Sequence, residues 1–401
     1  MPGPLSHLRI LDLSRILAGP WATQLLADLG AEVIKVERPD SGDDTRHWGP
    51  PYLRDTGEAA YYLSTNRGKR SLTLDLATPA GQDIARRLAR ESDVLVENFA
   101  VGTPARWGLD WPSLRAVNPR LVYCSITGYG QTGPNAQRAG YDFAIQAEAG
   151  LMSVTGERDA SGGGPQKLGV AVSDLTAGMY ASVAILAALV HRDRTGAGQH
   201  IDLALFDAQV AALANVALNY LVSGDVPRRW GNAHVNIVPY NLFETADRPI
   251  VLAVGNDAQF RRFGEVAGRR DLAADPRFAT NDARVRHRDA CVAALEPVLR
   301  ARTAADWLAA LGSAGIPCAP VNDVAEVFAS PQAVARGLRE DLPHPTAGTV
   351  PLVRNPIRLS ATPVTCEVPP PLLGQHTDAI LRERLGMSDA AIAGLRERGV
   401  V

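Results

Sequence analysis

Residues 169–189 read GVAVSDLTAGMYASVAILAAL, and the rest of the chain is organised around this stretch. The apolar run 168–172 predicts a strand, and Ser173 and Asp174 are residue types favoured at helix N-caps. The small and aliphatic residues that follow are apolar on nearly every face, which predicts a buried helix. Asp174 therefore has two interpretations. It is either only a helix cap, or a nucleophilic carboxylate held ionised by the helix dipole.

Upstream of this stretch, strands and helices alternate. Residues 8–13 predict a strand, 21–29 a helix that ends at Gly30, and 32–37 a second strand. A strand, helix and strand of this length form a βαβ unit with parallel strands and a right-handed crossover. The same alternation continues with strands at 71–76, 93–98, 121–127 and 200–205, and a helix at 79–90 capped by Thr78. We therefore expect an α/β fold with a Rossmann-like, doubly wound large domain.

A chain of 401 residues exceeds what one core usually supports. Residues 241–245 and 250–254 predict a hairpin, and helices are expected at 258–267, 283–300 and 304–312. This pattern is typical of a smaller α+β domain. The predicted division is residues 1–224 for the large domain, 225–330 for a linker and the small domain, and 331–401 for a Pro-rich C-terminal segment that returns to the large domain.

Composition excludes several classes of function. The net charge of −2 gives no electrostatic reason to expect a nucleic-acid partner. No uninterrupted apolar run reaches membrane-spanning length, and the N-terminus has no signal-peptide pattern. The four cysteines are far apart and form no metal-ligand pattern, nor do the histidines, so no metal is predicted; the cysteines are Cys124, Cys291, Cys318 and Cys366. Buried thiols at Cys124 and Cys318 are consistent with a reducing cytoplasm.

A doubly wound domain binds ligands beyond the carboxyl ends of its strands. The loop at 14–20 lacks the GxGxxG spacing, which disfavours an NAD site. Arg38, at the end of the second predicted strand, suits a phosphate-bearing ribose, but a surface ion pair explains it equally well. The small residues Ala18 and Gly19 would let a ligand approach the backbone closely.

Taken together, these motifs resemble the class III (CaiB/BaiF-type) CoA-transferases. The resemblance runs nearly end to end and in order, through ILDLSRILAGPWATQLLADLGAEVIKVERP, SGDDTRHWGPP, NRGKRSLTLDL, VENF, YCSITGYGQTGP, GYD, VSDLTAGMYA and PPPLLGQHT. Residues 228–234 and 237–240 look most like the subgroup of succinyl-CoA:glutarate (dicarboxylate) transferases. Leu17 replaces the glutamine of the formyl-CoA transferases, and their Gly-rich loop before the small domain is missing. Both departures argue against oxalate and formyl-CoA as substrates.

The resemblance implies roles for particular residues. Asp174 matches the catalytic aspartate that carries the anhydride and thioester intermediates. Coenzyme A and acyl-CoA are expected as substrates, with no permanently bound cofactor, and the protein is expected to form an interlocked homodimer. The residues at coenzyme-binding positions are Leu17, Ala18, Arg38, Leu74, Asp75, Ala77, Asn98, Phe99, Arg106, Ala139, Gly140 and Tyr141.

The predicted reaction moves CoA from an acyl-CoA, with succinyl-CoA as first choice, to a carboxylic acid such as glutarate. A dicarboxylate acceptor leaves one free carboxylate that suits a cationic partner. Candidates are Arg46, His47 and His234, together with Arg228 and Arg229, and a solvated surface charge is the alternative for each. The sequence does not distinguish glutarate from malate, itaconate or citramalate.

Two other functions are compatible with a CoA-binding fold. An α-methylacyl-CoA racemase pairs its aspartate with a histidine directly after a loop glycine, and this chain has Tyr141 there. A phenol with a pKa near 10 is a poor base at neutral pH, so Tyr141 favours the transferase. A catalytically silent CoA-binding protein is the second alternative, and the presence of both Asp174 and Tyr141 argues against it.

Overall fold

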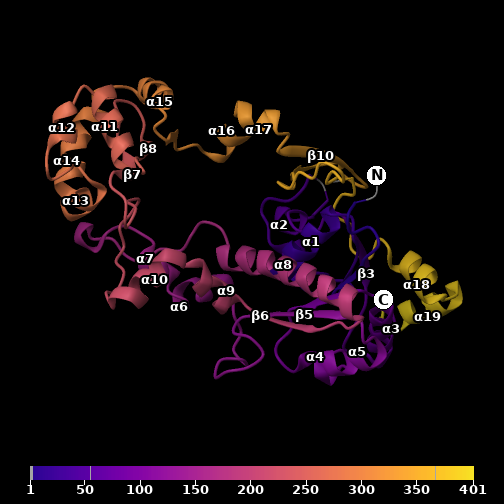
Figure 1. Ribbon diagram of the computed structural model, residues 1–401. Helices are drawn as coiled ribbons and strands as arrows, with labels where there is room; N and C mark the ends of the chain where they lie inside the picture. Colours follow the sequence, from indigo (N-terminus) through magenta and orange to yellow (C-terminus); the bar gives the residue numbers. More distant parts are fainter. Residues whose placement is uncertain (1–2, 55, 366) are drawn as a thin grey trace. The chain divides into compact units, whose positions relative to one another are not determined.

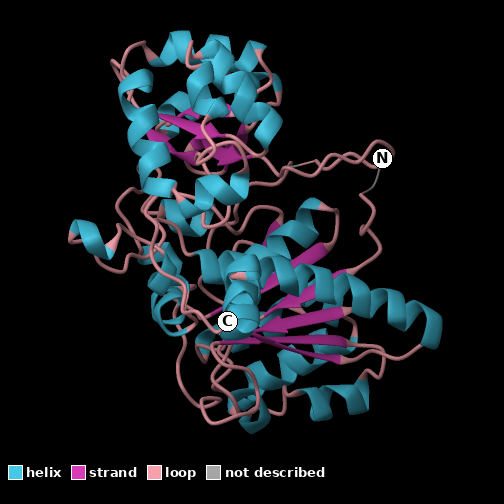
Figure 2. Ribbon diagram, turned by 60° about the vertical axis from the view of Figure 1, so that its left-hand side comes forward, coloured by secondary structure: helices cyan, strands magenta, loops and turns pink. Residues whose placement is uncertain are grey.

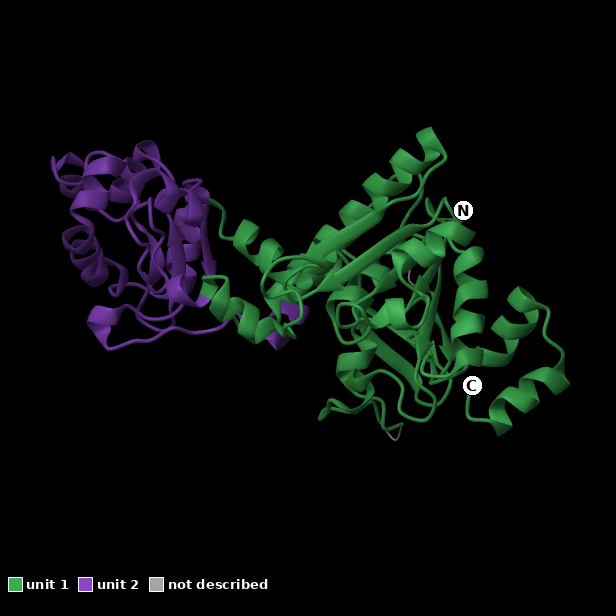
Figure 3. Ribbon diagram, turned by 90° about the horizontal axis from the view of Figure 1, so that it is seen from below, with its two compact units in different colours: residues 1–151, 168–214, 331–401 green, residues 152–167, 215–330 purple. Residues whose placement is uncertain are grey.

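The computed structural model describes residues 3–54, 56–365 and 367–401, so Cys366 lies outside the described residues (Figure 1). The chain forms two compact units (Figure 3). Unit 1 comprises residues 1–151, 168–214 and 331–401, and unit 2 comprises 152–167 and 215–330. These units differ from the expected division in two respects, because residues 152–167 and residues 215–224 group with unit 2.

Unit 1 is built on a six-stranded sheet in the order β3-β2-β1-β4-β5-β6, and every pairing is parallel. The strands are β1 (Arg9–Asp12), β2 (Glu32–Glu37), β3 (Lys69–Thr73), β4 (Val94–Glu97), β5 (Val122–Thr127) and β6 (His200–Ala204). Because β1 lies beside both β2 and β4, the chain winds outward from β1 in both directions. The sheet confirms the predicted α/β fold.

Helices cover both faces of this sheet (Figure 2). On one face, Ile10 and Val33 pack with α1 (Ala18–Asp28) and α8 (Val172–Thr195). On the other face, Leu11 and Ile34 pack with α3 (Pro79–Arg90), α5 (Trp111–Val117), α18 (Thr377–Leu385) and α19 (Asp389–Glu397). Neighbouring strand residues point to opposite faces, and both faces are buried, so apolar residues follow one another directly in strands such as β4, which reads VLVE.

The remaining elements of unit 1 are short. They are η1 (Asp44–His47), α2 (Ala60–Leu63), α4 (Thr103–Arg106), α6 (Asp142–Glu148), α9 (Leu205–Ala212), α17 (Pro331–Ala335) and the antiparallel hairpin β10 (Arg339–His344) and β11 (Gly348–Val353). Two helices span a boundary between the units, α7 (Leu151–Val154) and α10 (Ala214–Ser223). The chain breaks between α9 and α10 at Ala214, which has a φ of +46°.

Unit 2 contains a three-stranded antiparallel sheet of β7 (Tyr240–Phe243), β8 (Ile250–Ala253) and β9 (Cys318–Pro320). Its helices are η2 (Asp159–Ser161), α11 (Asp257–Val266), α12 (Arg270–Ala274), α13 (Asn281–Arg286), α14 (Arg288–Leu299), α15 (Ala304–Ser313) and α16 (Val324–Ala329). Phe260, Phe263 and Trp307 form the centre of its core. The arrangement is α+β.

The C-terminal segment packs on unit 1 in two places. Val350 and Leu352 of the hairpin form a small core with Tyr62 and Leu63. Further along, the backbone N–H of Thr73 donates to the Thr377 hydroxyl at 3.0 Å. The C-terminal segment therefore packs against the β3 edge of the sheet, near residues predicted to bind the coenzyme.

One helix among the described residues, α8, is long and apolar enough to span a membrane, and 44% of its apolar window is buried inside the protein. The bent pair α9 and α10 passes the same test only if counted as one span. Ala177, Ala181, Ile185 and Ala188 of α8 belong to the core of unit 1. The face of α8 that carries these four residues packs inside unit 1.

Candidate active site

Two adjoining cavities open at the carboxyl ends of β1, β2, β3 and β4. The first is about 340 Å³ and the second about 260 Å³. Arg15, Phe99 and Ala100 line both. Because β1 and β4 are neighbours from which the chain winds in opposite directions, the loops that follow them separate and leave a crevice. The second cavity lies at this crevice, with residues 15–18 and 98–101 on its walls.

Asp174 lines the second cavity. The structure corrects two local predictions about it. Residues 168–171 form no strand, and α8 begins at Val172, so Asp174 is the third helical residue and not the cap. The residue at the cap position is Ala171, whose side chain makes no capping bond. Asp174 is partly buried and stands in the first turn of a 24-residue helix.

The side chain of Asp142 caps α8 from another element. Its Oδ1 accepts the backbone N–H of Ser173 at 2.8 Å, and its Oδ2 accepts from Gln146 Nε2 at 2.6 Å. The buried Ser173 hydroxyl donates to Gln209 Oε1 at 2.8 Å. A carboxylate at a helix N-terminus satisfies one of the unpaired N–H groups there. This network fixes the first turn of α8 and so positions Asp174.

The electrostatics around Asp174 differ from the predicted ones. Burial raises the pKa of Asp174 to about 7, and the neighbouring charge of Asp142 adds to the rise. One of the two interpretations of the sequence was a carboxylate held ionised by the helix dipole; in the structure, burial and a like charge raise its pKa. Burial also raises the pKa of Tyr61 to about 12, with the charge of Asp174 as the next cause. A neutral phenol therefore stands near the carboxylate.

The backbone N–H groups on either side of Asp174 are engaged within the protein. The N–H of Leu175 donates to the Ala171 carbonyl at 3.1 Å, and that of Ser173 donates to Asp142. Neither of these two donors is therefore free to stabilise an oxyanion formed at Asp174.

Most residues predicted to bind the coenzyme line the two cavities. The first cavity is lined by Arg38, Leu74, Asp75, Ala77 and Phe99, and the second by Leu17, Ala18, Asn98, Phe99, Ala139, Gly140 and Tyr141. Arg38 makes an exposed ion pair with Asp44 at 2.7 Å. Arg106 is an exception: it is exposed, donates to the Thr103 hydroxyl at 2.9 Å, and is not among the described residues that line either cavity.

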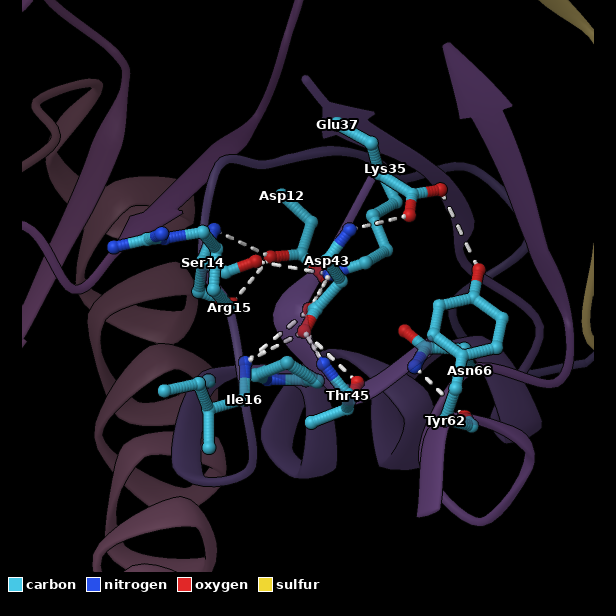
Figure 4. A network of polar contacts seen from close by, with 12 residues as sticks. Asp12, Ser14, Arg15, Ile16, Lys35, Glu37, Asp43, Thr45, Tyr62 and Asn66 are labelled. Carbon is cyan, nitrogen blue, oxygen red and sulfur yellow. Dashed lines mark hydrogen bonds and ion pairs between the residues drawn. The ribbon is translucent and has the colours of Figure 1, made fainter. Parts of the chain in front are cut away.

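A buried polar network supports the loop between β1 and α1 (Figure 4). Lys35 Nζ lies 2.9 Å from both Asp43 Oδ2 and the Ser14 carbonyl. Asp43 in turn accepts the backbone N–H of Ile16, which has a φ of +73°. A β-branched residue in this left-handed region is strained and persists only when its surroundings hold it. The strain therefore lies at the wall of the second cavity.

Asp43 and Lys35 are both ionised at neutral pH in this network. Burial alone would raise the pKa of Asp43, but Lys35 and the Thr45 N–H hold it at about 2. Burial would likewise lower the pKa of Lys35, but Asp43 and Asp12 offset it and raise that pKa. A buried ion pair of this kind contributes geometry more than stability. It keeps the cavity wall in one conformation.

Arg15 was not predicted as a site residue. It lines both cavities, and its Nη1 pairs with Asp44 Oδ2 at 3.0 Å. Within the described residues its Nε is buried with no hydrogen-bond acceptor. A buried donor without an acceptor is costly, so an anionic ligand at the junction of the cavities would stabilise it.

Gly128 and Gly140 let two loops approach each other at the second cavity. A Cβ atom on Gly140 would lie 2.4 Å from the Gly128 Cα. Neither position tolerates a side chain without a shift of backbone. Tyr141 follows directly, and its side chain is 61% exposed and lines the cavity that contains Asp174.

The three predicted substrate residues occupy different environments. Arg46 is buried and fully engaged: it pairs with Glu37 at 2.8 Å and Glu58 at 2.9 Å, and it donates to the Tyr62 hydroxyl at 2.6 Å. Its donors are therefore not free for a dicarboxylate, and the structure corrects this prediction. His47 is exposed, with Nε2 2.9 Å from the Ser41 carbonyl. His234 lies in unit 2, where its ring contacts Tyr240.

The comparisons with known proteins agree with one another. The sequence model of CoA-transferase family III matches residues 5–377. A succinate–glutarate CoA-transferase of Agrobacterium fabrum is 52% identical over 384 residues, which is 95% of each chain. The succinyl-CoA:glutarate CoA-transferase of Homo sapiens is 44% identical over 99% of this chain and 90% of its own. Among solved structures, a CaiB/BaiF family protein from Brucella suis has a TM-score of 0.84 at 49% identity, covering 96% of this chain and 100% of its own.

Proposed function

The chain belongs to CoA-transferase family III and is an enzyme that transfers coenzyme A; from this premise we propose that it moves CoA from succinyl-CoA to a dicarboxylate such as glutarate. The observation that carries the proposal is the Asp174 carboxylate in the wall of a cavity that adjoins a second one. The names of the relatives that act on succinate and glutarate support the choice of substrates. They do not favour a racemase.

The first proposed half-reaction loads the enzyme. The Asp174 carboxylate attacks the thioester carbonyl of succinyl-CoA, which gives an aspartyl–succinyl anhydride and releases CoA thiolate. The thiolate then attacks the aspartyl carbonyl, so that succinate leaves and an aspartyl-CoA thioester remains. A carboxylate suits this role because anhydride and thioester both conserve the acyl energy, which a hydroxyl would lose as a stable ester.

The second half-reaction runs the same steps backwards. The acceptor carboxylate attacks the aspartyl thioester, forming a new mixed anhydride and CoA thiolate. The thiolate attacks the acceptor's acyl carbonyl, which gives the new acyl-CoA and restores the Asp174 carboxylate. Coenzyme A and its esters are substrates throughout, and the scheme needs no permanently bound cofactor or metal.

The cavities suggest how the coenzyme lies. Its nucleotide would occupy the first cavity beside Arg38, and its pantetheine arm the second, ending at Asp174. The unpaired Nε of Arg15 stands at the junction and would meet a phosphate oxygen. His47 and His234 remain candidates for the far carboxylate of the acceptor.

Two further properties belong to the proposal. A homodimer is supported by apolar side chains left exposed on α8, including Met179 and Val183. A cytoplasmic location is supported by the described cysteines, Cys124, Cys291 and Cys318, all of which are free thiols. The interlocked form of the dimer is expected from the resemblance alone.

The test is a panel of carboxylic acids, each incubated with the enzyme and succinyl-CoA, with the acyl-CoA products identified by mass spectrometry. Glutaryl-CoA should form fastest and free succinate should appear in equal amount. In parallel, enzyme treated with succinyl-CoA and then with hydroxylamine should carry a hydroxamate at Asp174. Turnover with an unmodified Asp174 would exclude the covalent mechanism, while turnover with a different acid would correct only the acceptor.

A further inference from the structure

A third cavity, of about 350 Å³, is lined by residues of β4, β5 and β6 and of the loop that follows β4, and its polar groups take no part in the proposed transfer. We call it the Glu97 cavity, after its most buried carboxylate. Glu97, Ser125 and His200 line it from the three strands, and Asp110 and Trp111 line it from the start of α5. Asp174 is not among its described lining residues. It shares Phe99 and Ala100 with both cavities of the proposed coenzyme site.

The first carboxylate of this cavity is held inside the protein. Glu97 is 2% exposed, and its Oε2 accepts the backbone N–H of Phe99 at 2.9 Å. Burial raises the pKa of Glu97 to about 7, although hydrogen bonds from Ser125 and the Phe99 N–H oppose the rise. No lysine or arginine is among the described residues that line the cavity. The carboxylate therefore has no cation beside it there.

One oxygen of the second carboxylate lacks a hydrogen-bond donor among the described residues. Asp110 occupies the cap position of α5, but its side chain makes no capping bond. Its Oδ1 is buried and, within the described part of the chain, has no hydrogen-bond partner. Buried polar atoms are almost always paired, and leaving a carboxylate oxygen unpaired is costly. An oxygen of this kind at a cavity wall indicates a donor that arrives with a ligand.

Several of the other residues that line the cavity carry aromatic rings. The rings of Trp111 and His200 are nearly parallel, with an interplanar angle of 19° and centroids 6.4 Å apart. The ring of Tyr123 meets His200 edge-on at 5.5 Å. His200 Nε2 lies 3.0 Å from the Ser125 hydroxyl, and burial lowers the pKa of His200, so the ring adds no positive charge at neutral pH. Aromatic faces attract cations.

We propose that the Glu97 cavity binds a small organic ammonium ion, and that this occupant changes the affinity for acyl-CoA through the wall of Phe99 and Ala100. Two carboxylates supply the acceptors, and the aromatic rings supply an apolar surface for the carbon skeleton. The coupling follows from geometry. Glu97 accepts a hydrogen bond from the backbone N–H of Phe99, and Phe99 also lines both cavities of the proposed coenzyme site. The coupling is reciprocal for the two ligands.

Benzylamine is the probe, titrated calorimetrically into the full chain without CoA at pH 8, where Glu97 is ionised. A probe of about eight non-hydrogen atoms is expected to bind with a Kd on the order of 1 mM. Benzyl alcohol and benzoate have the same ring but no positive charge, and both should bind at least about tenfold more weakly. Equal binding of the alcohol or tighter binding of benzoate would overturn the proposal, as would the absence of benzylamine binding.

Two variants locate the probe. Asp110→Asn removes one charge and should weaken benzylamine about tenfold, and Ala105→Phe fills the cavity without removing a polar group and should abolish binding. Asp83→Asn, on an exposed position of α3, is the matched control and should bind benzylamine as the unaltered protein does. Unfolding temperatures identify any variant that fails to fold. Benzylamine binding that survives both cavity variants lies elsewhere and overturns the assignment.

The coupling is tested by the Kd of CoA with and without saturating benzylamine. A change of at least about twofold is expected in the unaltered protein, and none in Ala105→Phe. An unchanged Kd in the unaltered protein overturns the coupling. Because benzylamine binding is measured without any transfer reaction, failure of this site leaves the proposed transferase function intact, and the reverse also holds.

Discussion

At the scale of single residues, the Asp174 carboxylate must be ionised to act as a nucleophile, although burial raises its pKa to about 7. The value of kcat/KM for succinyl-CoA reports the ionisation of the free enzyme. We therefore expect it to fall about tenfold per pH unit below pH 7 and to level off above it. Initial rates between pH 5.5 and 9 measure this acid limb of the kcat/KM profile. A flat profile down to pH 5.5 would contradict the high pKa.

Asp142 is the charged neighbour that contributes to this pKa. Asp142→Asn should move the acid limb of kcat/KM downward by about one pH unit, since a neighbouring like charge is removed. The amide also turns an N–H toward Gln146, so some loss of stability is expected. Gln146→Met is the matched control, because it disturbs the same network and leaves the charge. It should lower the unfolding temperature and leave the limb in place.

The raised pKa of Asp174 also affects stability. The folded state keeps the proton more tightly than the unfolded chain, whose Asp has a pKa near 3.8. The stabilising contribution is therefore complete below that pH and is lost as pH rises toward about 7. Asp174→Asn removes the penalty of a buried charge and should stabilise the protein by about 2 kcal/mol at pH 8, with little effect near pH 4. Urea denaturation at the two pH values measures the difference, and equal effects would argue against burial as the cause.

At the scale of elements, the close approach of two loops shapes the second cavity. Gly140→Ala places a Cβ within 2.4 Å of the Gly128 Cα and must displace one loop. Since Ala139 and Tyr141 line the cavity on either side, KM for succinyl-CoA should rise about tenfold or more while the fold persists. Gly169→Ala is the control, because nothing lies within 4 Å of a Cβ there. An unchanged KM in Gly140→Ala would mean that the loop does not contact the coenzyme.

How far the elements can be predicted depends on whether the local sequence carries signals for where a helix or strand begins and ends. Helix α3 begins and ends where the sequence predicts, because Thr78 and Pro79 mark its start and the Thr78 hydroxyl accepts the Gly81 N–H at 3.1 Å. Strand β2 also matches. Helix α8 starts earlier than predicted, because its cap is a side chain 30 residues upstream, that of Asp142, which no local pattern reveals. The break between α9 and α10 at Ala214 has no glycine or proline beside it, so the sequence does not indicate it.

The candidate site was predictable where one loop contributes one motif, and not where distant side chains meet. Asp174 and the loop residues around the two cavities follow from the order of strands and from the resemblance. Asp142 raises the pKa of Asp174 through space, and Asp174 in turn raises that of Tyr61, but nothing in their sequence neighbourhoods indicates that these groups lie near one another. Arg46 illustrates the opposite error. A lone arginine in a loop suggests a free cation, but Glu37 and Glu58 already neutralise it.

At the scale of the whole molecule, both units leave apolar side chains exposed. On α8 these are Met179 at 49%, Tyr180 at 46%, and Val183 and Val190 at 61% each. Their spacing places them along one face of the helix. On α10, within unit 2, Leu221 is 74% and Val222 is 80% exposed. An exposed apolar helix face such as that of α8 marks an interaction site, and a second copy of the chain would cover it in the proposed homodimer.

The proposed homodimer can therefore be tested at one position on α8. Val183→Glu places a charge in the middle of the exposed apolar face, where burial against a partner would leave it unpaired. The unaltered protein should sediment at twice the 42.7 kDa of one chain, and Val183→Glu at the mass of one. Asp83→Lys, an equally drastic change on an exposed position of α3, should leave the mass unaltered. Because the side chain of Val183 is mostly exposed in one chain, the variant should still fold, which circular dichroism checks. A dimer that survives Val183→Glu would place the interface on another surface, and the apolar face of α8 would then need a different partner to cover it.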